Sequence, residues 1–289
     1  MPPRYLLGCE SSLGRWVVLR RLLAALCLVL LLAGGALARG TLDVIRQRGV
    51  LVVGVKADFP PFGFVDERGQ LQGFDIDLSR EIARIVLGSP DRVRLVTVTS
   101  ANRIPMLQTE QIDAVVATMT ITRARKQVVD FSVPYFCSGH LILVRRDNTT
   151  ITKFSDLNGK RVATVQGSTG DRVAATLAPQ AQRITFGQNS EALLALKDGR
   201  AEAFVQDDVL LLAFAKQDNT LKVVGWPPQM PGPYGIGVRK GDADLLATIN
   251  VALARLRAQG VHVRLVSKWF GEVAGQLLPA NKCPLELQL

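Results

Sequence analysis

The stretch "GVLVVGVKADFPPFGFVDERGQLQGFDIDLSREIARIVLG", residues 49–88, decides the fold. It reads as a strand at 50–55, a proline-rich turn, a short extended piece through Gly69 and then a helix. The apolar residues of the helix recur at helical spacing, at Leu78, Ile82, Ile85 and Val86. Strand followed by helix predicts the repeating unit of an α/β fold.

The alternation continues along the chain. Residues 93–99 predict a strand, 102–111 a short helix and 112–119 a continuous apolar strand of the kind buried in a parallel sheet. An extended stretch at 139–145 and a polar segment follow, and strands and helices then alternate again from 161 to 217. We expect a further strand at 221–225, a proline-rich loop at 226–233, an extended piece at 234–240 and two helices over 242–270. The pattern predicts two doubly wound α/β lobes.

The N-terminus has the order of a secretory signal. Arg15, Arg20 and Arg21 precede the apolar run 22–33, and "ALA" follows at 36–38. The run is shorter than the roughly 20 residues that span a bilayer. We expect residues 1–38 to be a signal peptide, cleaved after Ala38, and the protein to be exported to the periplasm. An uncleaved N-terminal anchor helix is the alternative.

The remaining chain is basic, but its pattern does not favour nucleic acid. Residues 1–38 hold four arginines and one glutamate, so 31 basic and 24 acidic residues remain, a net charge of +7. The charges are scattered and are not interleaved with aromatic side chains, so we expect no nucleic-acid partner. Cys137 and Cys283 are the cysteines outside the signal segment. An oxidising compartment permits one bridge between them, and the sequence leaves open whether it forms.

Polar side chains follow several predicted strands. Lys56, Thr118, Thr120 and Asp207 come just after apolar strands, and ligands of α/β proteins bind at the carboxyl ends of strands. We therefore expect these four side chains on one rim of a cleft between the lobes.

Other residues suit an anion. Arg125 stands in the first turn of a predicted helix capped by Thr122, and its guanidinium offers a planar fork for a carboxylate. Ser168 and Thr169 open a helix after a glycine-rich turn, where hydroxyls and backbone N–H groups hold anions. In the pair Asp207–Asp208, we expect one carboxylate to cap the next helix and the other to face a cation.

The sequence contains few signs of a catalytic site. The two histidines, His140 and His262, have no metal-ligand spacing, and no nucleophile motif is present. We expect a binding protein with no catalytic residue, no metal and no cofactor.

Six segments in unbroken order carry a family resemblance: "GVLVVGVKADFPPF", "GFDIDLSREIA", "IDAVVATMTITRARKQVVDFSVPY", "RVATVQGST", "AEAFVQDDVLL" and "YGIGVRKGD". Over roughly residues 42–271 the chain resembles the periplasmic solute-binding proteins for polar amino acids (family 3), and among them the glutamate/aspartate-binding proteins of ABC transporters. The pattern ITxxRxxxVDFSxPY at 121–135 is its most specific part.

The resemblance implies a periplasmic binding protein of type II. Lobe 1 would comprise 42–140 and 236–271, lobe 2 would comprise 141–235, and 272–289 would be a C-terminal tail. Two hinge strands, near 139–145 and 234–239, would join the lobes. A monomer would close on one amino acid and deliver it to a membrane ABC permease.

The resemblance also implies roles for residues of the site. Arg125 matches the arginine that grips the ligand's α-carboxylate, helped by Thr120 and by Thr169 with its backbone N–H. Asp207 matches the carboxylate that holds the α-ammonium, with a carbonyl from Thr118. Phe59 matches the aromatic ring that lies against the ligand's side chain.

The choice of ligand is expected to depend on Lys56 and Arg103, which look like the basic pair of the glutamate and aspartate binders. Buried cations would select against basic ligands and favour a second carboxylate. Glutamate and aspartate stay unranked, and glutamine stays open because its amide oxygen can accept a hydrogen bond from Lys56. Two other classes remain. One is a periplasmic lyase of the cyclohexadienyl dehydratase type on the same fold, and the other is a receptor domain.

Overall fold

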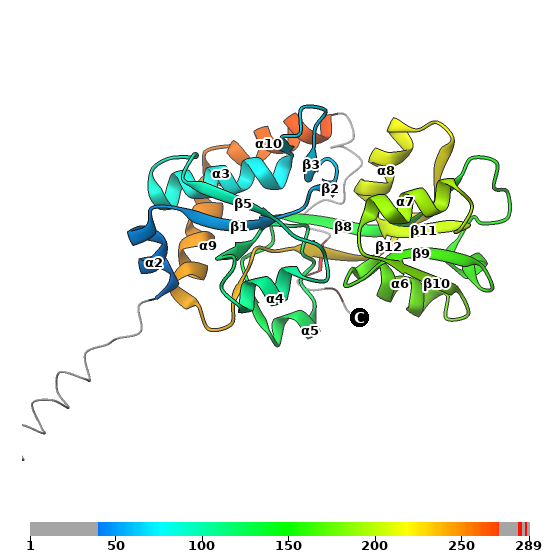
Figure 1. Cartoon of the computed structure of the whole chain (residues 1–289), viewed down its shortest axis with the longest axis horizontal. Helices are drawn as coiled ribbons and strands as arrows, with labels where there is room; N and C mark the ends of the chain where they lie inside the picture. The colour runs from blue at the N-terminus through cyan, green and yellow to red at the C-terminus, as the bar shows by residue number, and fades with distance from the viewer. Residues whose placement is uncertain (1–39, 272–282, 285–286, 288–289) are drawn as a thin grey trace, which may run out of the picture. The chain divides into compact units, whose positions relative to one another are not determined.

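The computed structural model describes residues 40–271, 283–284 and 287 (Figure 1). The predicted signal peptide and most of the predicted tail lie outside these residues. From Thr41 onward the chain forms one compact unit that contains two five-stranded sheets. Within the described part, no helix is long and apolar enough to cross a membrane.

Sheet I consists of β1 (Leu51–Val55), β5 (Val93–Thr97), β6 (Ala114–Val115), β7 (Val129–Phe131) and β13 (Gly237–Arg239). Its strand order is β5-β1-β6-β13-β7. Strand β1 pairs in parallel with β5 and β6, whereas β13 runs antiparallel to β6 and β7. Strands β5, β1 and β6, which the sequence predicts in alternation with helices, therefore form the parallel half of this sheet.

Among the described residues, the helices that accompany sheet I are α2 (Thr41–Arg48), α3 (Phe74–Leu87), α4 (Arg103–Gln108), α5 (Arg123–Lys126), α9 (Ala243–Ala258) and α10 (Val261–Phe270). Strand β1 is buried on both faces. Val53 packs in the cluster that holds Ile82 of α3, while its neighbour Val52 packs with Leu107 of α4. Burial on both sides explains the unbroken apolar run of this strand. A small antiparallel sheet, β2 (Asp58–Phe59), β3 (Gly63–Val65) and β4 (Leu71–Gln72), follows β1.

Sheet II consists of β8 (Phe136–Arg145), β9 (Arg161–Val165), β10 (Gln182–Phe186), β11 (Ala203–Asp207) and β12 (Leu221–Tyr234), in the order β10-β9-β11-β8-β12. Its helices are α6 (Thr169–Leu177), α7 (Asn189–Lys197) and α8 (Asp208–Gln217), with a 3-10 turn η1 at Phe154–Leu157. Helices α7 and α8 cover one face and α6 the other (Figure 1). The α/β class predicted from the sequence is confirmed.

The chain passes between the sheets twice. It leaves sheet I after β7 and enters β8, and it returns from β12 to β13. Backbone bonds join the two crossings: Ser132 donates to Ile236 at 2.9 Å and Tyr135 donates to Tyr234 at 2.9 Å. The segment 139–145, expected to be one crossing, instead lies inside sheet II, where β8 pairs with both β11 and β12. The exact lobe boundaries stay a prediction.

The proline-rich segment 226–233, predicted as a loop, lies within β12. Strand β12 is at the edge of sheet II and pairs only with β8 among the described strands. Prolines are tolerated at an edge, where one side of the strand makes no ladder bonds. The pairing also shifts register between Val224 and Gln229 and again before Gly232. The prediction failed because an edge strand with bulges accommodates residues that normally break strands.

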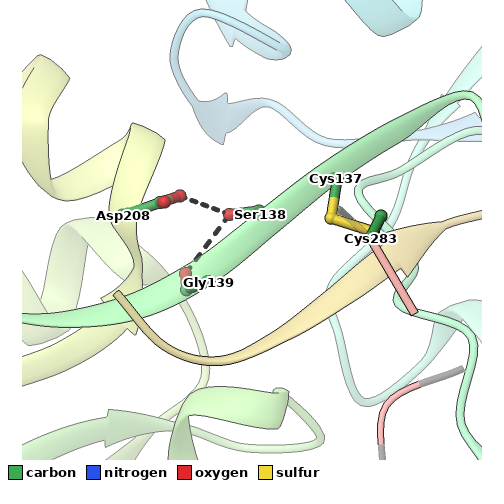
Figure 2. Close-up of a disulfide and its surroundings, with 5 residues drawn as sticks. All are labelled: Cys137, Ser138, Gly139, Asp208 and Cys283. Atoms are coloured by element: carbon green, nitrogen blue, oxygen red, sulfur yellow. Dashed lines mark hydrogen bonds between the residues drawn. A yellow bond between two sulfur atoms is a disulfide. The ribbon is translucent and has the colours of Figure 1, made fainter. Parts of the chain in front are cut away.

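Cys137 and Cys283 form a disulfide with Cα atoms 6.0 Å apart (Figure 2). The bond joins residues separated by 146 positions and attaches the C-terminal segment to β8. A second attachment lies nearby, where the backbone N–H of Leu287 donates to Ile121 at 2.8 Å. The pairing that the sequence left open is therefore present.

Candidate functional site

The predicted site residues are gathered at the ends of strands from both sheets. Lys56 follows β1, Thr118 and Thr120 follow β6, and Asp207 ends β11. All nine are buried, with exposed fractions of 8% or less: Lys56, Phe59, Arg103, Thr118, Thr120, Arg125, Ser168, Thr169 and Asp207. The ends of these strands thus assemble a buried polar group, and the binding roles of its residues stay a prediction.

Arg125 connects the two sheets. Thr122 caps α5 by accepting from the Arg125 backbone N–H, as expected. The guanidinium donates through Nη1 to the Thr120 carbonyl at 2.7 Å and through Nη2 to the Gly167 carbonyl, before α6, at 2.9 Å. Burial lowers the pKa of Arg125 well below its ordinary value, and the nearby Arg103 acts in the same direction. A buried guanidinium of this kind favours an anionic partner.

A chain of hydroxyls continues from Arg125 toward sheet II. The Oγ1 atoms of Thr120 and Thr169 are 3.4 Å apart, and Thr169 Oγ1 is 3.0 Å from His140 Nε2. Ser168, beside them, caps α6 by accepting from the Asp171 backbone N–H. His140 is 2% exposed on β8. Its position in the sequence did not identify it as a site residue, because the two histidines have no metal-ligand spacing.

Asp207 is held by two side chains. The Tyr234 hydroxyl donates to its Oδ2, and His140 Nε2 lies 3.3 Å from its Oδ1. Asp207 occupies the N-cap position of α8 but makes no side-chain cap. Asp208 accepts from the Ser138 hydroxyl at 2.5 Å (Figure 2) and from the Val209 N–H at 2.7 Å. The expectation that one aspartate caps the helix is therefore wrong, because Asp207 makes no side-chain cap and Asp208 lies inside the first turn.

Arg103 donates to backbone oxygens and feels the charges of nearby carboxylates. Its Nη1 donates to the carbonyls of Ala117 at 2.6 Å and Thr118 at 3.5 Å. Asp75 accepts from the Thr118 N–H at 3.0 Å. Burial lowers the pKa of Arg103 to about 10, opposed by Asp207 first and more weakly by Asp75. Burial also raises the pKa of Asp75 to about 7.

Lys56 also has a compensating neighbour. Its Nζ lies 3.0 Å from Ser100 Oγ. Burial lowers its pKa to about 8, while the charge of Asp58 opposes that change. Asp58 in turn accepts from the backbone N–H of Asn189, at the start of α7, at 2.6 Å. The sequence predicted Lys56 and Arg103 as a basic pair, and in the structure the charges of Asp58 and Asp75 act on these two cations.

A cleft of about 880 Å³ lies between residues of the two sheets. Lys56, Asp58 and Thr99 line one side, and Gly187 and Ser190 line the other. Among the described residues that line this cleft, Lys56 is the one that the sequence predicted to contact the ligand. Phe59 belongs to the aromatic cluster around Phe62, with ring centroids 5.9 Å apart. Within the described residues, no group of three or more acidic, histidine or cysteine side chains could hold a metal ion.

The family model of the bacterial extracellular solute-binding proteins, family 3, matches residues 51–272. The chain belongs to this family. The family resemblance that the sequence suggested is therefore confirmed, and the family's name describes extracellular binding proteins.

Two relatives within the family carry glutamine in their names. The chain is 37% identical to the ABC transporter glutamine-binding protein GlnH of Bacillus subtilis over 235 residues, 81% of this chain and 86% of that protein. It is 42% identical to the glutamine-binding protein of Geobacillus stearothermophilus over 202 residues, 69% and 76% of the two chains. Both are named as binding proteins rather than enzymes.

A solved structure is similar over most of its length. An ancestral arginine-binding protein bound to glutamine is 44% identical, with a TM-score of 0.74, and the match covers 78% of this chain and 99% of that one. Glutamine, which the sequence left open, is thus the ligand named for these three similar proteins.

Four members of the polar interior were missed from the sequence: His140, Tyr234, Asp75 and Asp58. Asp207 pairs with His140 in the β11–β8 ladder, so their proximity depends on the register between strands far apart in the chain. A histidine inside the apolar run "CSGHLILV" was the available signal. It did not identify the carboxylate across the sheet.

Proposed function

We propose that this chain is the amino-acid-binding component of an ABC uptake transporter. The observation that carries the proposal is the burial of Arg125 and Asp207, opposite charges 8% and 4% exposed, together with the hydroxyls of Thr120 and Thr169. A zwitterion offers one carboxylate and one ammonium, and buried charges are favourable only when paired. Arg125 would hold the carboxylate and Asp207 the ammonium.

Arg125 has capacity for a ligand. A guanidinium carries five N–H donors, and in the structure one donates to Thr120 and one to Gly167. The hydroxyls of Ser168 and Thr169 at the start of α6 would support the same carboxylate. Thr118 would add its carbonyl to the ammonium, and Phe59 would pack against the ligand's side chain.

We propose glutamine as the preferred ligand. The cations Lys56, Arg103 and Arg125 are balanced by the carboxylates Asp58, Asp75 and Asp207, so an uncharged amide side chain keeps the interior neutral. Because burial raises the pKa of Asp75 to about 7, some positive charge remains at neutral pH and glutamate would rank second. Arginine would add a third positive charge beside Lys56 and Arg103 and would rank last.

The test is isothermal titration of the protein with glutamine, glutamate, aspartate, histidine and arginine. We expect micromolar or tighter binding of glutamine, weaker binding of glutamate and no measurable binding of arginine. Binding of arginine alone would contradict the ligand assignment. Absence of binding by every amino acid would contradict the function itself.

Lys56→Met tests whether Lys56 contacts the ligand's side chain, because methionine keeps most of the length of lysine and removes its charge. We expect the affinity for glutamate to fall about tenfold more than that for glutamine, since a charged acceptor loses more than a neutral one. Titration calorimetry with both ligands measures the difference. Equal losses would mean that Lys56 does not contact the ligand's side chain.

Export and delivery complete the proposal. Residues 1–38 would direct the chain to the periplasm, and the monomer would hand its ligand to a membrane permease. Ligand contact with both sheets would favour the closed form over an open one.

A further inference from the structure

His140 sits at the centre of a buried polar group that the proposed contacts do not explain. Its Nε2 lies 3.3 Å from Asp207 Oδ1 and 3.0 Å from Thr169 Oγ1. Its Nδ1 lies 3.2 Å from the Gln229 carbonyl oxygen. The ring thus contacts both Asp207, which we propose holds the ligand's ammonium, and Thr169, which we propose supports its carboxylate.

The partners fix the positions of the protons. A carbonyl oxygen only accepts, so the bond to Gln229 places a proton on Nδ1. In the neutral ring the lone pair of Nε2 would then face a carboxylate oxygen at 3.3 Å, and two acceptors need a proton between them. The Tyr234 hydroxyl already donates to the other oxygen of Asp207. A second proton on His140 therefore satisfies the contact.

A ligand's ammonium group would compete for the same carboxylate. It brings a positive charge and three N–H donors to Asp207, which is what the imidazolium supplies. Arg125, Arg103 and Lys56 already act on Asp207 as buried cations. One more cation beside an imidazolium would be unfavourable in this interior.

We propose that His140 is a positioning residue that makes amino-acid binding depend on pH. In the unliganded protein its proton holds Asp207 in place, and the ligand's ammonium takes over that role. The imidazolium then loses its Nε2 proton to solvent, and the neutral ring accepts from the Thr169 hydroxyl. This inference rests on the proposed function and adds a proton to its binding reaction.

The sign follows from linkage. Because the unliganded form binds one more proton, the affinity falls as the pH falls, by up to about tenfold per pH unit. Other groups nearby also titrate or carry charge. Asp208 on α8 has its pKa raised by burial to about 6, Asp75 to about 7, and the pKa of Tyr234 on β12 lies well above its ordinary value, chiefly through burial.

The first experiment needs no ligand. The chain has two histidines, so His262→Gln assigns their proton and nitrogen resonances by elimination. We expect the His140 signals of the unliganded protein to show a proton on both ring nitrogens at pH 6. A neutral ring at that pH, with Nε2 unprotonated, would overturn the proposal whatever the protein binds.

The second experiment measures the proton directly. Glutamine is titrated calorimetrically at pH 6.5 in phosphate and in imidazole buffer, whose ionisation enthalpies differ. We expect the heats to differ by the release of up to one proton per ligand in wild type and in the control Asp208→Asn. His140→Gln, which keeps a neutral N–H donor, should release none and should bind with a flat pH profile.

The outcomes separate the two proposals. Equal heats in both buffers for wild type, or equal release by wild type and His140→Gln, would overturn the role of His140 while leaving amino-acid binding intact. Failure of every amino acid to bind at pH 8 would instead contradict the proposed function.

Discussion

Arg125 shows how one side chain acts on both sheets. It follows β6 in sheet I, yet its guanidinium donates to the carbonyl of Thr120 and also to that of Gly167. Gly167 lies between β9 and α6 in the part of the chain that forms sheet II. Lysine has the same charge but a single nitrogen, so it cannot reproduce a planar fork.

Arg125→Lys should therefore weaken amino-acid binding about 10- to 100-fold, or ~1.4 to 2.7 kcal/mol. Titration calorimetry measures the loss. Arg123→Lys is the matched control, since Arg123 lies two positions earlier on the same short helix and is exposed. We expect its affinity to stay within about twofold of wild type. Unchanged binding by Arg125→Lys would show that Arg125 does not contact the ligand.

The raised pKa of Asp75 predicts how the stability of the folded protein depends on pH. Burial raises its pKa from 3.8 to about 7 in the folded protein. Between these values the folded state binds more protons than the unfolded state, so stability falls as the pH rises from about 4 to about 7. Asp208, whose pKa burial raises to about 6, acts in the same direction.

Asp75→Asn should flatten this dependence, because the amide does not titrate. We expect the difference in thermal midpoint between variant and wild type to shift in favour of the variant as the pH rises from 5.5 to 7.5. A difference that stays constant over this range would mean that Asp75 ionises normally in the folded protein.

At the scale of elements, β8 connects most of the features described above. It pairs with β11 and β12, places His140 opposite Asp207, and carries Cys137 next to Ser138, which bonds Asp208 (Figure 2). The disulfide fixes Cys283 to this same strand. A cross-link over a long chain segment stabilises mainly by restricting the unfolded state.

Replacing Cys137 and Cys283 together by serine should lower the free energy of unfolding by about 2 to 5 kcal/mol. Denaturant unfolding with and without a reductant measures this contribution. Reductant should destabilise wild type and leave the double variant unchanged. Equal stability of oxidised and reduced wild type would show that the bond contributes nothing.

At the scale of the whole molecule, residues of the two sheets approach closely at Gly167. This glycine has φ +76°, and a Cβ there would lie 2.8 Å from the Ser100 carbonyl oxygen and 2.9 Å from Ala101 Cα. Together with the contacts Thr120–Thr169 and Asp58–Asn189, this approach belongs to the form in which both sheets contribute to one site.

Gly167→Ala should weaken ligand binding about tenfold or more, or ~1.4 kcal/mol, because the added methyl obstructs this approach. Gly159→Ala is the matched control: Gly159 has the same φ of +76°, and no described atom lies within 4 Å of its added Cβ. Both variants carry the backbone strain of about 1 kcal/mol, and only the first loses affinity. Equal affinities would contradict a role for the contact in the bound form.

The sequence by itself determined most of the strands and helices and the family to which the chain belongs, but it did not predict the helix Thr41–Arg48 or the strand Val129–Phe131. Helical and strand periodicities are local properties, so the strand at Leu51–Val55 and the helix at Phe74–Leu87 can be predicted from neighbouring residues. The motif around Arg125 is likewise continuous in the chain. The edge strand through 226–233 escaped prediction because its pairing depends on β8, far away in sequence.

Only the tertiary structure decided the electrostatics of the site. The register of β8 against β11 places His140 beside Asp207, and burial raises or lowers the pKa values of Asp75, Arg103 and Lys56. The placement of Asp58 and Asp75 near the two cations could not be predicted, because desolvation and charge pairing arise when distant segments meet in a low-dielectric interior. For the same reason the structure, and not the sequence, joined Cys137 to Cys283.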